Sequence, residues 1–340
     1  MSKKTVLVTG GAGFIGSAFV RMVMETRPDL SLINLDALTY SGNLENLEAV
    51  AGHSRYEFVR GDIRDLDIVS RLMQRCEAVV HFAAESHVDR SIQDSAPFVT
   101  TNVHGTQVLL DAARRCEIEK FVHVSTDEVY GSLPLDDREA TFREDSPIRP
   151  NSPYAASKAS SDLFVGAYFK TFGLPVCITR CSNNFGPYQF PEKIIPLFVT
   201  NLMQGEKVPL YGDGLHVRDW LHVDDHCEAL LRVLDDGEAG QIYNIGGNNE
   251  HSNLGLTHSI LEILGVGEEM IRPVEDRLGH DRRYAIDASK ILDDLGWEPT
   301  RSRWPEALEQ TVRWYQDHEK WWKRVRSGAY RKYYEEQYGR

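Results

Sequence analysis

Short apolar, β-branched runs alternate with longer stretches of helical periodicity through the first half of the chain. We expect strands at residues 5–9, 31–35, 56–59, 78–82 and 120–125. We expect helices at residues 17–24, 66–75, about 101–116 and about 154–172. This alternation predicts an α/β fold, in which helices cover both faces of a doubly wound parallel sheet.

A glycine-rich turn follows the first predicted strand and opens the first predicted helix. Gly10, Gly13 and Gly16 have the spacing that lets the backbone approach a pyrophosphate at a helix N-terminus. The second predicted strand leads to Asp36, about 20 residues further on, where a carboxylate would accept hydrogen bonds from ribose hydroxyls. Asp36 would repel a 2′-phosphate and no arginine adjoins it, so the pattern favours NAD over NADP.

Ligands of doubly wound sheets bind beyond the carboxyl ends of the strands. The residues that follow the predicted strands therefore mark one candidate edge: Gly10, Asp36, Asp62, Ala83, and Ser125 with Thr126. Asp62 is a candidate partner for an adenine amino group, and a helix cap is the plainer alternative.

Tyr154 and Lys158 form a candidate proton-transfer pair. Their i, i+4 spacing places both on one face at the start of a predicted helix. A free phenol has a pKa of about 10, and we expect a neighbouring ammonium and the positive nicotinamide ring together to lower the pKa of Tyr154 toward neutrality. Asp127 and Glu128 follow the sheet edge and add a second acid and base, which simple alcohol oxidation does not need.

The composition narrows the function classes. The chain has 340 residues, and 38 basic against 51 acidic residues give a net charge of −13, which argues against nucleic-acid binding. The five cysteines have no zinc-ligand spacing, and neither do His81, His104 and His123, so no metal site is predicted. We see neither a signal peptide nor an apolar span, so we expect a cytoplasmic protein without a membrane partner.

Several segments together resemble a known family. They are residues 9–16, 38–43, 83–91, 125–131, 151–158, 183–188, 191–197, 218–220 and 276–284. On these segments the chain is similar, almost from end to end, to the extended short-chain dehydrogenases/reductases and, within them, to the dTDP-glucose 4,6-dehydratases. Asp127 and Glu128 are specific to the dehydratase branch. Leu278 departs from the family pattern, which often has proline there.

The resemblance implies a hydro-lyase of deoxysugar biosynthesis that dehydrates a nucleoside-diphosphate glucose. Tyr154, beside Lys158, would deprotonate the C4 hydroxyl while hydride passes from C4 to NAD. Glu128 would then take the C5 proton, and Asp127 would protonate the departing C6 hydroxyl. Thr126 would hydrogen-bond the C4 oxygen. Hydride returns to C6, so the cofactor should stay bound between turnovers.

The resemblance also implies two sets of binding residues. The cofactor set is Gly10, Gly13, Phe14, Ile15, Gly16, Asp36, Leu38, Thr39, Asp62, Ile63, Ala83, Ala84, Ser86, Thr101, Ser125, Tyr154, Lys158 and Asn184. The substrate set is Ser86, Thr126, Asn183, Lys193, Leu197, Tyr211, Arg218, Asn253, Arg277, His280 and Tyr284. The cationic members suit a diphosphate. Asn253 is the weakest assignment, because residues 251–255 match the family only loosely.

The domain organisation follows from the same comparison. We expect a Rossmann-like NAD-binding domain from residues 1–180 plus about 221–248, and a smaller mixed α/β sugar-nucleotide lobe from about 181–220 and 249–330. The helices at about 101–116 and 155–172 are candidates for a homodimer interface. The aromatic residues of the tail should pack the lobe: Trp304, Trp314, Tyr315, Trp321 and Trp322. Residues 330–340 should be a surface segment.

Three functions remain in competition. The favoured one is dehydration of dTDP-glucose, with the same reaction on UDP-glucose as a close variant. An epimerase or decarboxylase would use Tyr154 and NAD but would leave Asp127 and Glu128 without a role. A non-catalytic NAD-sensing protein would not need these side chains together. Whether the product serves cell-surface rhamnose or a secondary metabolite is left open by the residues.

Overall fold

The computed structural model describes residues 4–327, and the segment predicted at residues 330–340 lies outside them. A seven-stranded sheet, in which every pair of neighbours is parallel, organises the chain with the order β10-β6-β5-β4-β1-β2-β3. Its strands are β1 (Lys4–Thr9), β2 (Leu30–Asp36), β3 (Tyr56–Arg60), β4 (Ala78–His81), β5 (Lys120–Thr126), β6 (Val176–Cys181) and β10 (Ile242–Ile245). The predicted doubly wound α/β fold is confirmed.

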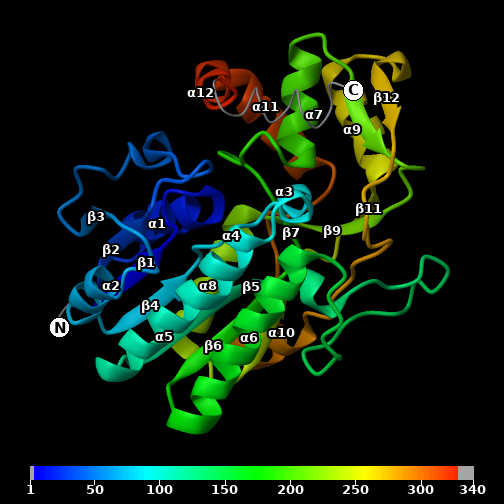
Figure 1. The fold of residues 1–340 in the computed structure, drawn as a ribbon. Helices are drawn as coiled ribbons and strands as arrows, with labels where there is room; N and C mark the ends of the chain where they lie inside the picture. The colour runs from blue at the N-terminus through cyan, green and yellow to red at the C-terminus, as the bar shows by residue number, and fades with distance from the viewer. Residues whose placement is uncertain (1–3, 328–340) are drawn as a thin grey trace.

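Two layers of helices cover the sheet (Figure 1). One apolar cluster joins the sheet to the first layer, which consists of α1 (Phe14–Thr26), α8 (Val223–Asp236) and α10 (Ser289–Leu295). A second cluster joins the opposite face to α2 (Leu66–Met73), α5 (Thr106–Arg115) and α6 (Pro153–Phe172). Side chains alternate between the faces of a strand, so neighbouring strand residues feed different clusters: Val6 and Val8 the first, Leu7 the second.

The helix predicted at about 101–116 begins at residue 99, and its first part is π-helical. After α3 (Val88–Gln93) and the short α4 (Ala96–Phe98), a π-helical stretch, Val99–Gly105, leads into α5. The carbonyl oxygen of Asn102 accepts hydrogen bonds from the hydroxyls of Thr106 and Ser161, both at 2.6 Å. These hydroxyls compete with backbone N–H groups for that carbonyl oxygen, which accounts for the π-helical hydrogen-bond pattern of this stretch.

The second half of the chain builds smaller units above the sheet. The strands β7 (Asn183–Phe185), β9 (Val217–His222) and β11 (Glu250–Ser252) form one sheet, and β8 (Val208–Tyr211) pairs with β12 (Ile271–Val274). The helices are α7 (Ile194–Met203), α9 (Asn253–Leu264), α11 (Glu306–Asp317) and α12 (Glu319–Val325), gathered at the top of Figure 1. Short 3₁₀ helices span Leu44–Leu47, Asp127–Tyr130 and Glu268–Met270.

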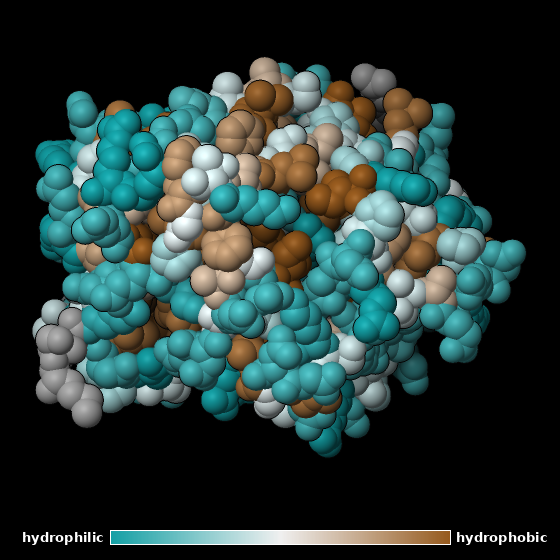
Figure 2. Space-filling view, turned by 90° about the horizontal axis from the view of Figure 1, so that it is seen from below, coloured by the Kyte–Doolittle hydropathy of each residue, from teal (hydrophilic) through white to brown (hydrophobic). Residues whose placement is uncertain are grey.

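The aromatic residues of the tail pack as predicted. Trp304, Trp314, Tyr315, Trp321 and Trp322 belong to one apolar cluster with α7 and α9. The five cysteines are free thiols, and all but Cys116 are buried. The face shown in Figure 2 is largely polar, with hydrophobic side chains exposed in places. Among the described residues, no helix combines the length and apolarity needed to cross a membrane.

Candidate active site

The turn between β1 and α1 leaves space for a ligand at the helix N-terminus. Gly10 has a φ of +73°, and a Cβ built on it would lie 2.7 Å from the backbone of Ala83. A Cβ on Gly16 would lie 2.3 Å from the carbonyl oxygen of Gly10. Gly13, the N-cap residue, has no side chain to bond the first N–H groups of α1. The turn therefore fits the pyrophosphate of a dinucleotide.

Asp36 ends β2 beside this turn. Its two carboxylate oxygens accept hydrogen bonds from Ala12 N at 2.9 Å and from Leu38 N at 2.8 Å. Each oxygen keeps a second lone pair, so the carboxylate can still accept from two ligand hydroxyls. Burial raises the pKa of Asp36, and the two backbone donors counter that effect.

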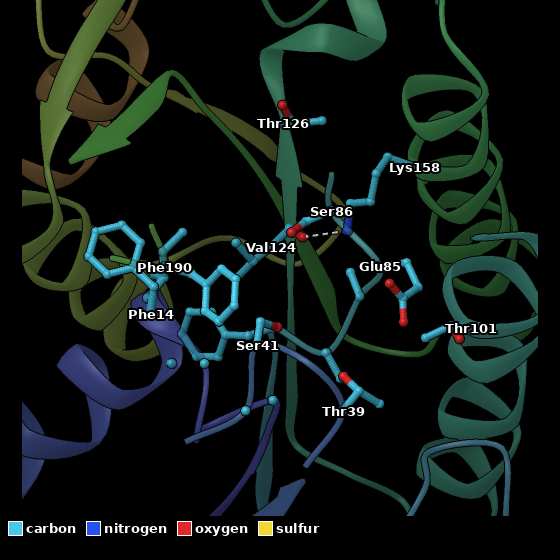
Figure 3. Close-up of a pocket in the computed structure, with 18 of the residues that line it drawn as sticks. Phe14, Thr39, Ser41, Glu85, Ser86, Thr101, Val124, Thr126, Lys158 and Phe190 are labelled. Carbon is cyan, nitrogen blue, oxygen red and sulfur yellow. Dashed lines mark hydrogen bonds between the residues drawn. The ribbon is translucent and has the colours of Figure 1, made fainter. Parts of the chain in front are cut away.

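A cavity of about 400 Å³ extends along the carboxyl edge of the sheet from this turn (Figure 3). Every residue of the predicted cofactor set lines it except Leu38, which contributes only its backbone bond to Asp36. Asp62 lines the cavity too, but its carboxylate is ion-paired with Arg64 at 2.6 Å. That pairing neutralises Arg64, so this guanidinium is already engaged by a carboxylate.

The predicted catalytic residues meet at one end of this cavity. Thr126 ends β5, and its hydroxyl caps the 3₁₀ helix that carries Asp127 and Glu128. Tyr154 and Lys158 lie in the first turns of α6, which Ser152 caps through a 3.1 Å bond to Ala155 N. All five predicted catalytic residues line the cavity: Thr126, Asp127, Glu128, Tyr154 and Lys158.

Lys158 and Tyr154 are both deeply buried. Lys158 Nζ donates a 2.8 Å hydrogen bond to the carbonyl oxygen of Val124, shown dashed in Figure 3. Burial lowers the pKa of Lys158 to about 8. Burial, followed by the negative charge of Glu128, raises the pKa of Tyr154 well above its ordinary value. Desolvation is the largest cause of this shift in the protein alone, and the lowering expected from Lys158 together with the nicotinamide ring stays a prediction for the NAD-bound protein.

The two adjacent carboxyls differ in their surroundings. Burial raises the pKa of Asp127 strongly, and the negative charges of Glu128 and Asp219 raise it further. Burial also raises the pKa of Glu128, but the positive charges of Arg277 and Lys193 oppose this. The arrangement therefore favours a protonated Asp127 beside an ionised Glu128. A protonated carboxyl suits the predicted acid, and an ionised carboxylate suits the predicted base.

A second cavity of about 130 Å³ adjoins the first and lies among β9, α7 and α9. Glu128, Asn183, Glu192 and Lys193 line both cavities, so the two spaces meet at Glu128, one of the predicted catalytic residues. Nine members of the predicted substrate set line the second cavity, namely Asn183, Lys193, Leu197, Tyr211, Arg218, Asn253, Arg277, His280 and Tyr284. The other two members, Ser86 and Thr126, line the first.

The cations of the second cavity are held in place by the protein. Arg218 donates to the carbonyl oxygens of Val217 at 2.7 Å and Asp281 at 2.8 Å, and its guanidinium lies 4.2 Å from the centroid of the Tyr284 ring. Arg277 lies 3.6 Å from the carboxylate of Asp89. The buried Oδ1 of Asn183 has no hydrogen-bond partner among the described residues. Fixed guanidinium groups suit an anionic ligand, and the amide oxygen can accept a hydrogen bond from a ligand hydroxyl.

Known proteins are similar to this chain in sequence and in fold. The sequence profile described as GDP-mannose 4,6 dehydratase matches residues 7–310. The dTDP-glucose 4,6-dehydratase of Streptomyces niveus is 53% identical over 326 residues, which cover 95% of this chain and 96% of that protein. The chain belongs to the dTDP-glucose 4,6-dehydratase family. The resemblance on which the sequence analysis relied is thus confirmed.

Solved structures of this dehydratase family agree with the assignment. A dTDP-glucose 4,6-dehydratase from Streptomyces venezuelae, with NAD and TYD bound, is 52% identical and has a TM-score of 0.92 over 94% of this chain and 99% of that chain. A UDP-glucose 4-epimerase from Thermotoga maritima, solved with UDP-glucose, is 31% identical with a TM-score of 0.83 over 92% of this chain and 99% of that chain. Dehydratases and epimerases therefore share the fold, and the site residues must separate them.

The sequence analysis missed some of the residues that line the cavities. Ser41, Glu85 and Phe190 line the first, His87 and Asp89 line the second, and Glu192 lines both. The Glu192 carboxylate is only 2% exposed and pairs with Arg90 Nε at 3.2 Å. Glu192 stands next to Lys193 just before the apolar run of α7, which reads as an ordinary exposed charge pair, and its position at the junction depends on tertiary packing.

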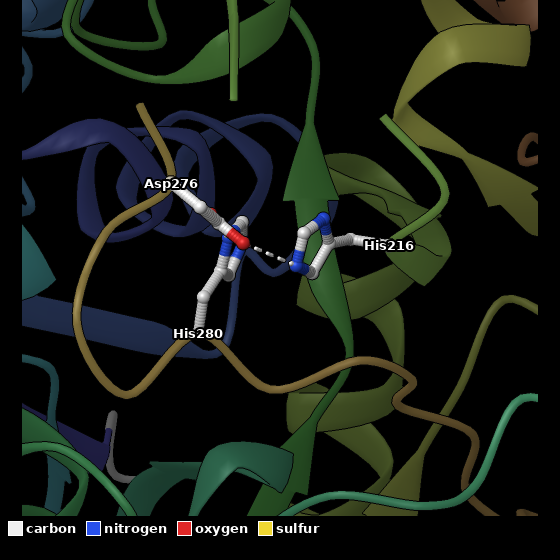
Figure 4. A group of neighbouring side chains, drawn as sticks. All are labelled: His216, Asp276 and His280. Atoms are coloured by element: carbon white, nitrogen blue, oxygen red, sulfur yellow. Dashed lines mark hydrogen bonds and ion pairs between the residues drawn. The ribbon is translucent and has the colours of Figure 1, made fainter. Parts of the chain in front are cut away.

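His216, Asp276 and His280 form a group with metal-like spacing behind the second cavity (Figure 4). Asp276 lies 2.6 Å from His280 Nδ1 and 3.2 Å from His216 Nε2. The imidazole rings are stacked, with centroids 3.6 Å apart and planes 14° apart, so their nitrogen lone pairs do not converge on one ion. The Arg282 guanidinium also contacts His216 at 3.2 Å. We interpret the group as a support that orients His280 toward the cavity.

Proposed function

We propose that this protein is an NAD-dependent hydro-lyase that converts dTDP-glucose to dTDP-4-keto-6-deoxyglucose. The observation that carries the proposal is that Tyr154, Asp127 and Glu128 line one cavity suited to a dinucleotide, and that this cavity meets a pocket with fixed cations at Glu128. Relatives with this activity in their names support it, as does a Bacillus anthracis family member crystallised with NAD, which is 48% identical. The uncapped glycine turn and Asp36 fit NAD.

Oxidation at C4 needs a base for the hydroxyl proton. NAD, when bound, supplies the acceptor for the C4 hydride and the donor for C6. Tyr154 takes the proton of the C4 hydroxyl, and Thr126, at the end of β5, hydrogen-bonds the same oxygen. Because burial raises the pKa of Tyr154, the phenolate forms only when positive charge is close to it. Lys158, one turn further along α6, contributes such a charge.

Elimination of water needs a second base and an acid. The C4 ketone acidifies the C5 hydrogen, and Glu128 removes it because Arg277 and Lys193 help to keep its carboxylate ionised. Asp127, kept protonated by burial and by Glu128, gives its proton to the departing C6 hydroxyl. An epimerase would have no use for this pair, which supports dehydration as the reaction.

The two cavities support a division of the chain by task. We place the NAD-binding domain at residues 1–180 plus about 221–248, and the sugar-nucleotide lobe at about 181–220 and 249–330. The apolar cluster of α7, α9, α11 and α12 supports the second unit. Helix α10 is an exception within it, because Ile291 packs in the cluster of the large sheet.

Two further features belong to the proposal. We propose a homodimer in which α5 and α6 of two copies pack together, supported by the exposed apolar side chains of α6: Leu163, Phe164 and Phe172. Unpaired thiols at all five cysteines suit a reducing compartment, so we propose that the enzyme works in the cytoplasm.

The activity can be tested with a panel of nucleotide sugars. The purified holoenzyme is incubated with dTDP-, UDP-, CDP- and GDP-glucose, and the products are treated with alkali, in which a 4-keto-6-deoxy sugar absorbs strongly in the ultraviolet. We expect the highest kcat/KM for dTDP-glucose. Faster turnover of UDP-glucose would reassign the nucleobase, and an epimerised product without alkaline absorbance would refute the dehydratase assignment.

A further inference from the structure

The segment from Asp36 to Asn43 leaves the end of β2 and returns to the glycine-rich turn. Leu38 N donates to Asp36 Oδ1 at 2.8 Å, and Asn43 N donates to the carbonyl oxygen of Ala12 at 3.0 Å. Both ends of the loop are therefore tied to the predicted dinucleotide site. Between them, Thr39 and Ser41 line the first cavity, as Figure 3 shows.

Tyr40, between these two lining residues, does not line the cavity. The Arg90 guanidinium lies 4.0 Å from the centroid of the Tyr40 ring. Phe190 contacts the ring edge-on, with centroids 5.6 Å apart and planes at 87°. The phenol oxygen is itself buried. The side chain thus fastens the tip of the loop to α3 and to the segment before α7.

The partners of Tyr40 are themselves anchored at the junction of the cavities. Arg90 Nε is 3.2 Å from the Glu192 carboxylate, and Glu192 lines both cavities. Lys193 Nζ donates to the carbonyl oxygen of Ser86 at 3.1 Å, which joins the same segment to the end of β4. Opening the loop would therefore require Tyr40 to leave a cation–π contact, an aromatic contact and a buried environment.

We propose that Tyr40 is a positioning residue that holds the 37–43 segment closed over the cofactor cavity, so that NAD does not exchange between turnovers. The inference rests on the proposed function. A dehydratase regenerates its cofactor within each cycle and has no need to release it, whereas a dehydrogenase must exchange NAD in every cycle. Tyr40 lines neither cavity, so it acts through Thr39 and Ser41, which line the first.

The test measures the exchange of bound NAD in the absence of sugar. Holoenzymes of the wild type, Tyr40→Ala and Tyr40→Phe are loaded with radiolabelled NAD and chased with unlabelled NAD. We expect Tyr40→Ala to release the label about 10- to 100-fold faster, because it loses both ring contacts. Tyr40→Phe keeps the ring and should release it at the wild-type rate. Equal rates for wild type and Tyr40→Ala would overturn the proposal.

Two further variants separate retention from folding. Arg90→Gln removes the cation beside the Tyr40 ring and keeps a hydrogen-bonding group for Glu192, so it should also speed the exchange. Tyr188→Ala is the control, because it removes a ring whose centroid lies 4.4 Å from the guanidinium of Arg21, and neither residue lines the first cavity. This variant should not speed the exchange of NAD. If Tyr188→Ala releases NAD as fast as Tyr40→Ala does, the effect is general loosening and the proposal fails.

Activity gives the second readout. Tyr40→Ala should be inactive after gel filtration and should recover wild-type kcat and sugar KM when NAD is added at saturation. Failure to recover would show that Tyr40 does more than retain the cofactor and would contradict the proposal. If the wild type binds NAD but dehydrates no nucleotide sugar, the proposed function fails, while the exchange rates still decide the role of Tyr40.

Discussion

Asp127 and Glu128 are neighbours in the sequence, yet different charged groups act on their two carboxyls. Asp127 is buried and Glu128 is half-buried. Arg218 is the cation that opposes the raised pKa of Asp127, whereas Arg277 and Lys193 are the main cations that oppose the raised pKa of Glu128. This difference supports the proposed roles of Asp127 as the acid and Glu128 as the base.

Glu128→Gln should stop the reaction after oxidation. The variant retains Tyr154 and Lys158, so it should form the 4-ketone of the intact hexose, while dehydration falls about 100- to 10,000-fold because no base removes the C5 proton. Rapid quenching and mass analysis of the sugar would detect the 4-ketone. Tyr154→Phe, as the matched control, should form no ketone at all. Full dehydration by Glu128→Gln would exclude Glu128 as the base.

The pH dependence of kcat should have two limbs. Burial raises the pKa of Glu128 above its ordinary value, so the base is lost as the pH falls through that raised pKa. Burial lowers the pKa of Lys158 to about 8, so the ammonium that assists Tyr154 is present below that pH and lost above it. We therefore expect a bell-shaped profile whose alkaline limb lies near pH 8.

Rates of the holoenzyme on dTDP-glucose across a pH series would measure both limbs. Lys158→Met should be slower throughout and should lack the alkaline limb. An unchanged alkaline limb in Lys158→Met would assign that limb to another group.

At the scale of elements, α6 supports the site from behind. Four residues after Lys158, Asp162 pairs with Arg180 Nε at 2.9 Å and lies 3.3 Å from His123 Nε2, all of them buried. Burial alone would raise the pKa of Asp162, but the bond from His123 and the charge of Arg180 lower it overall. A lowered pKa means that the ionised carboxylate stabilises the fold at neutral pH and that this contribution disappears as the pH falls.

Asp162→Asn should therefore reduce the free energy of unfolding by about 3–5 kcal/mol at neutral pH, because Arg180 would remain buried without its countercharge. Urea unfolding followed by tryptophan fluorescence would measure the change. The exposed Asp317→Asn on α11 is the control and should leave the free energy of unfolding unchanged. The difference between Asp162→Asn and wild type should shrink in acid, and no difference at neutral pH would contradict this role.

Features that depend on local sequence pattern could be predicted from the sequence. Strand and helix periodicity predicted the sheet, and the spacing of Tyr154 and Lys158 predicted their shared face. Features that depend on tertiary packing stayed hidden: the burial that raises the pKa of Tyr154, the π-helical start before α5, and the position of Glu192 at the junction. Desolvation and long-range neighbours cannot be seen in the order of residues alone.

At the scale of the whole molecule, the exposed apolar residues of α6 predict association. Leu163 is 63% exposed, and a large apolar side chain at such exposure favours a partner surface. Leu163→Asp should convert the proposed dimer into a monomer, because the two-fold axis would bring the introduced charges together. Light scattering after gel filtration would determine the mass.

Leu292→Asp, on α10, makes the same change at an apolar residue that is 45% exposed and outside the proposed interface. This control should remain dimeric. A monomeric wild type would refute the proposed dimer. A dimer that survives Leu163→Asp but not Leu292→Asp would show that the interface lies elsewhere.

The central claim is that one site oxidises C4, eliminates water and reduces C6 of the same sugar. Its most direct measurement uses dTDP-glucose that carries deuterium at C4, turned over by the holoenzyme in ordinary water and analysed by NMR. The account predicts deuterium on C6 of the 4-keto-6-deoxy product and a solvent-derived hydrogen at C5. Deuterium returned to C4 of an epimer, or lost to the solvent, would contradict it.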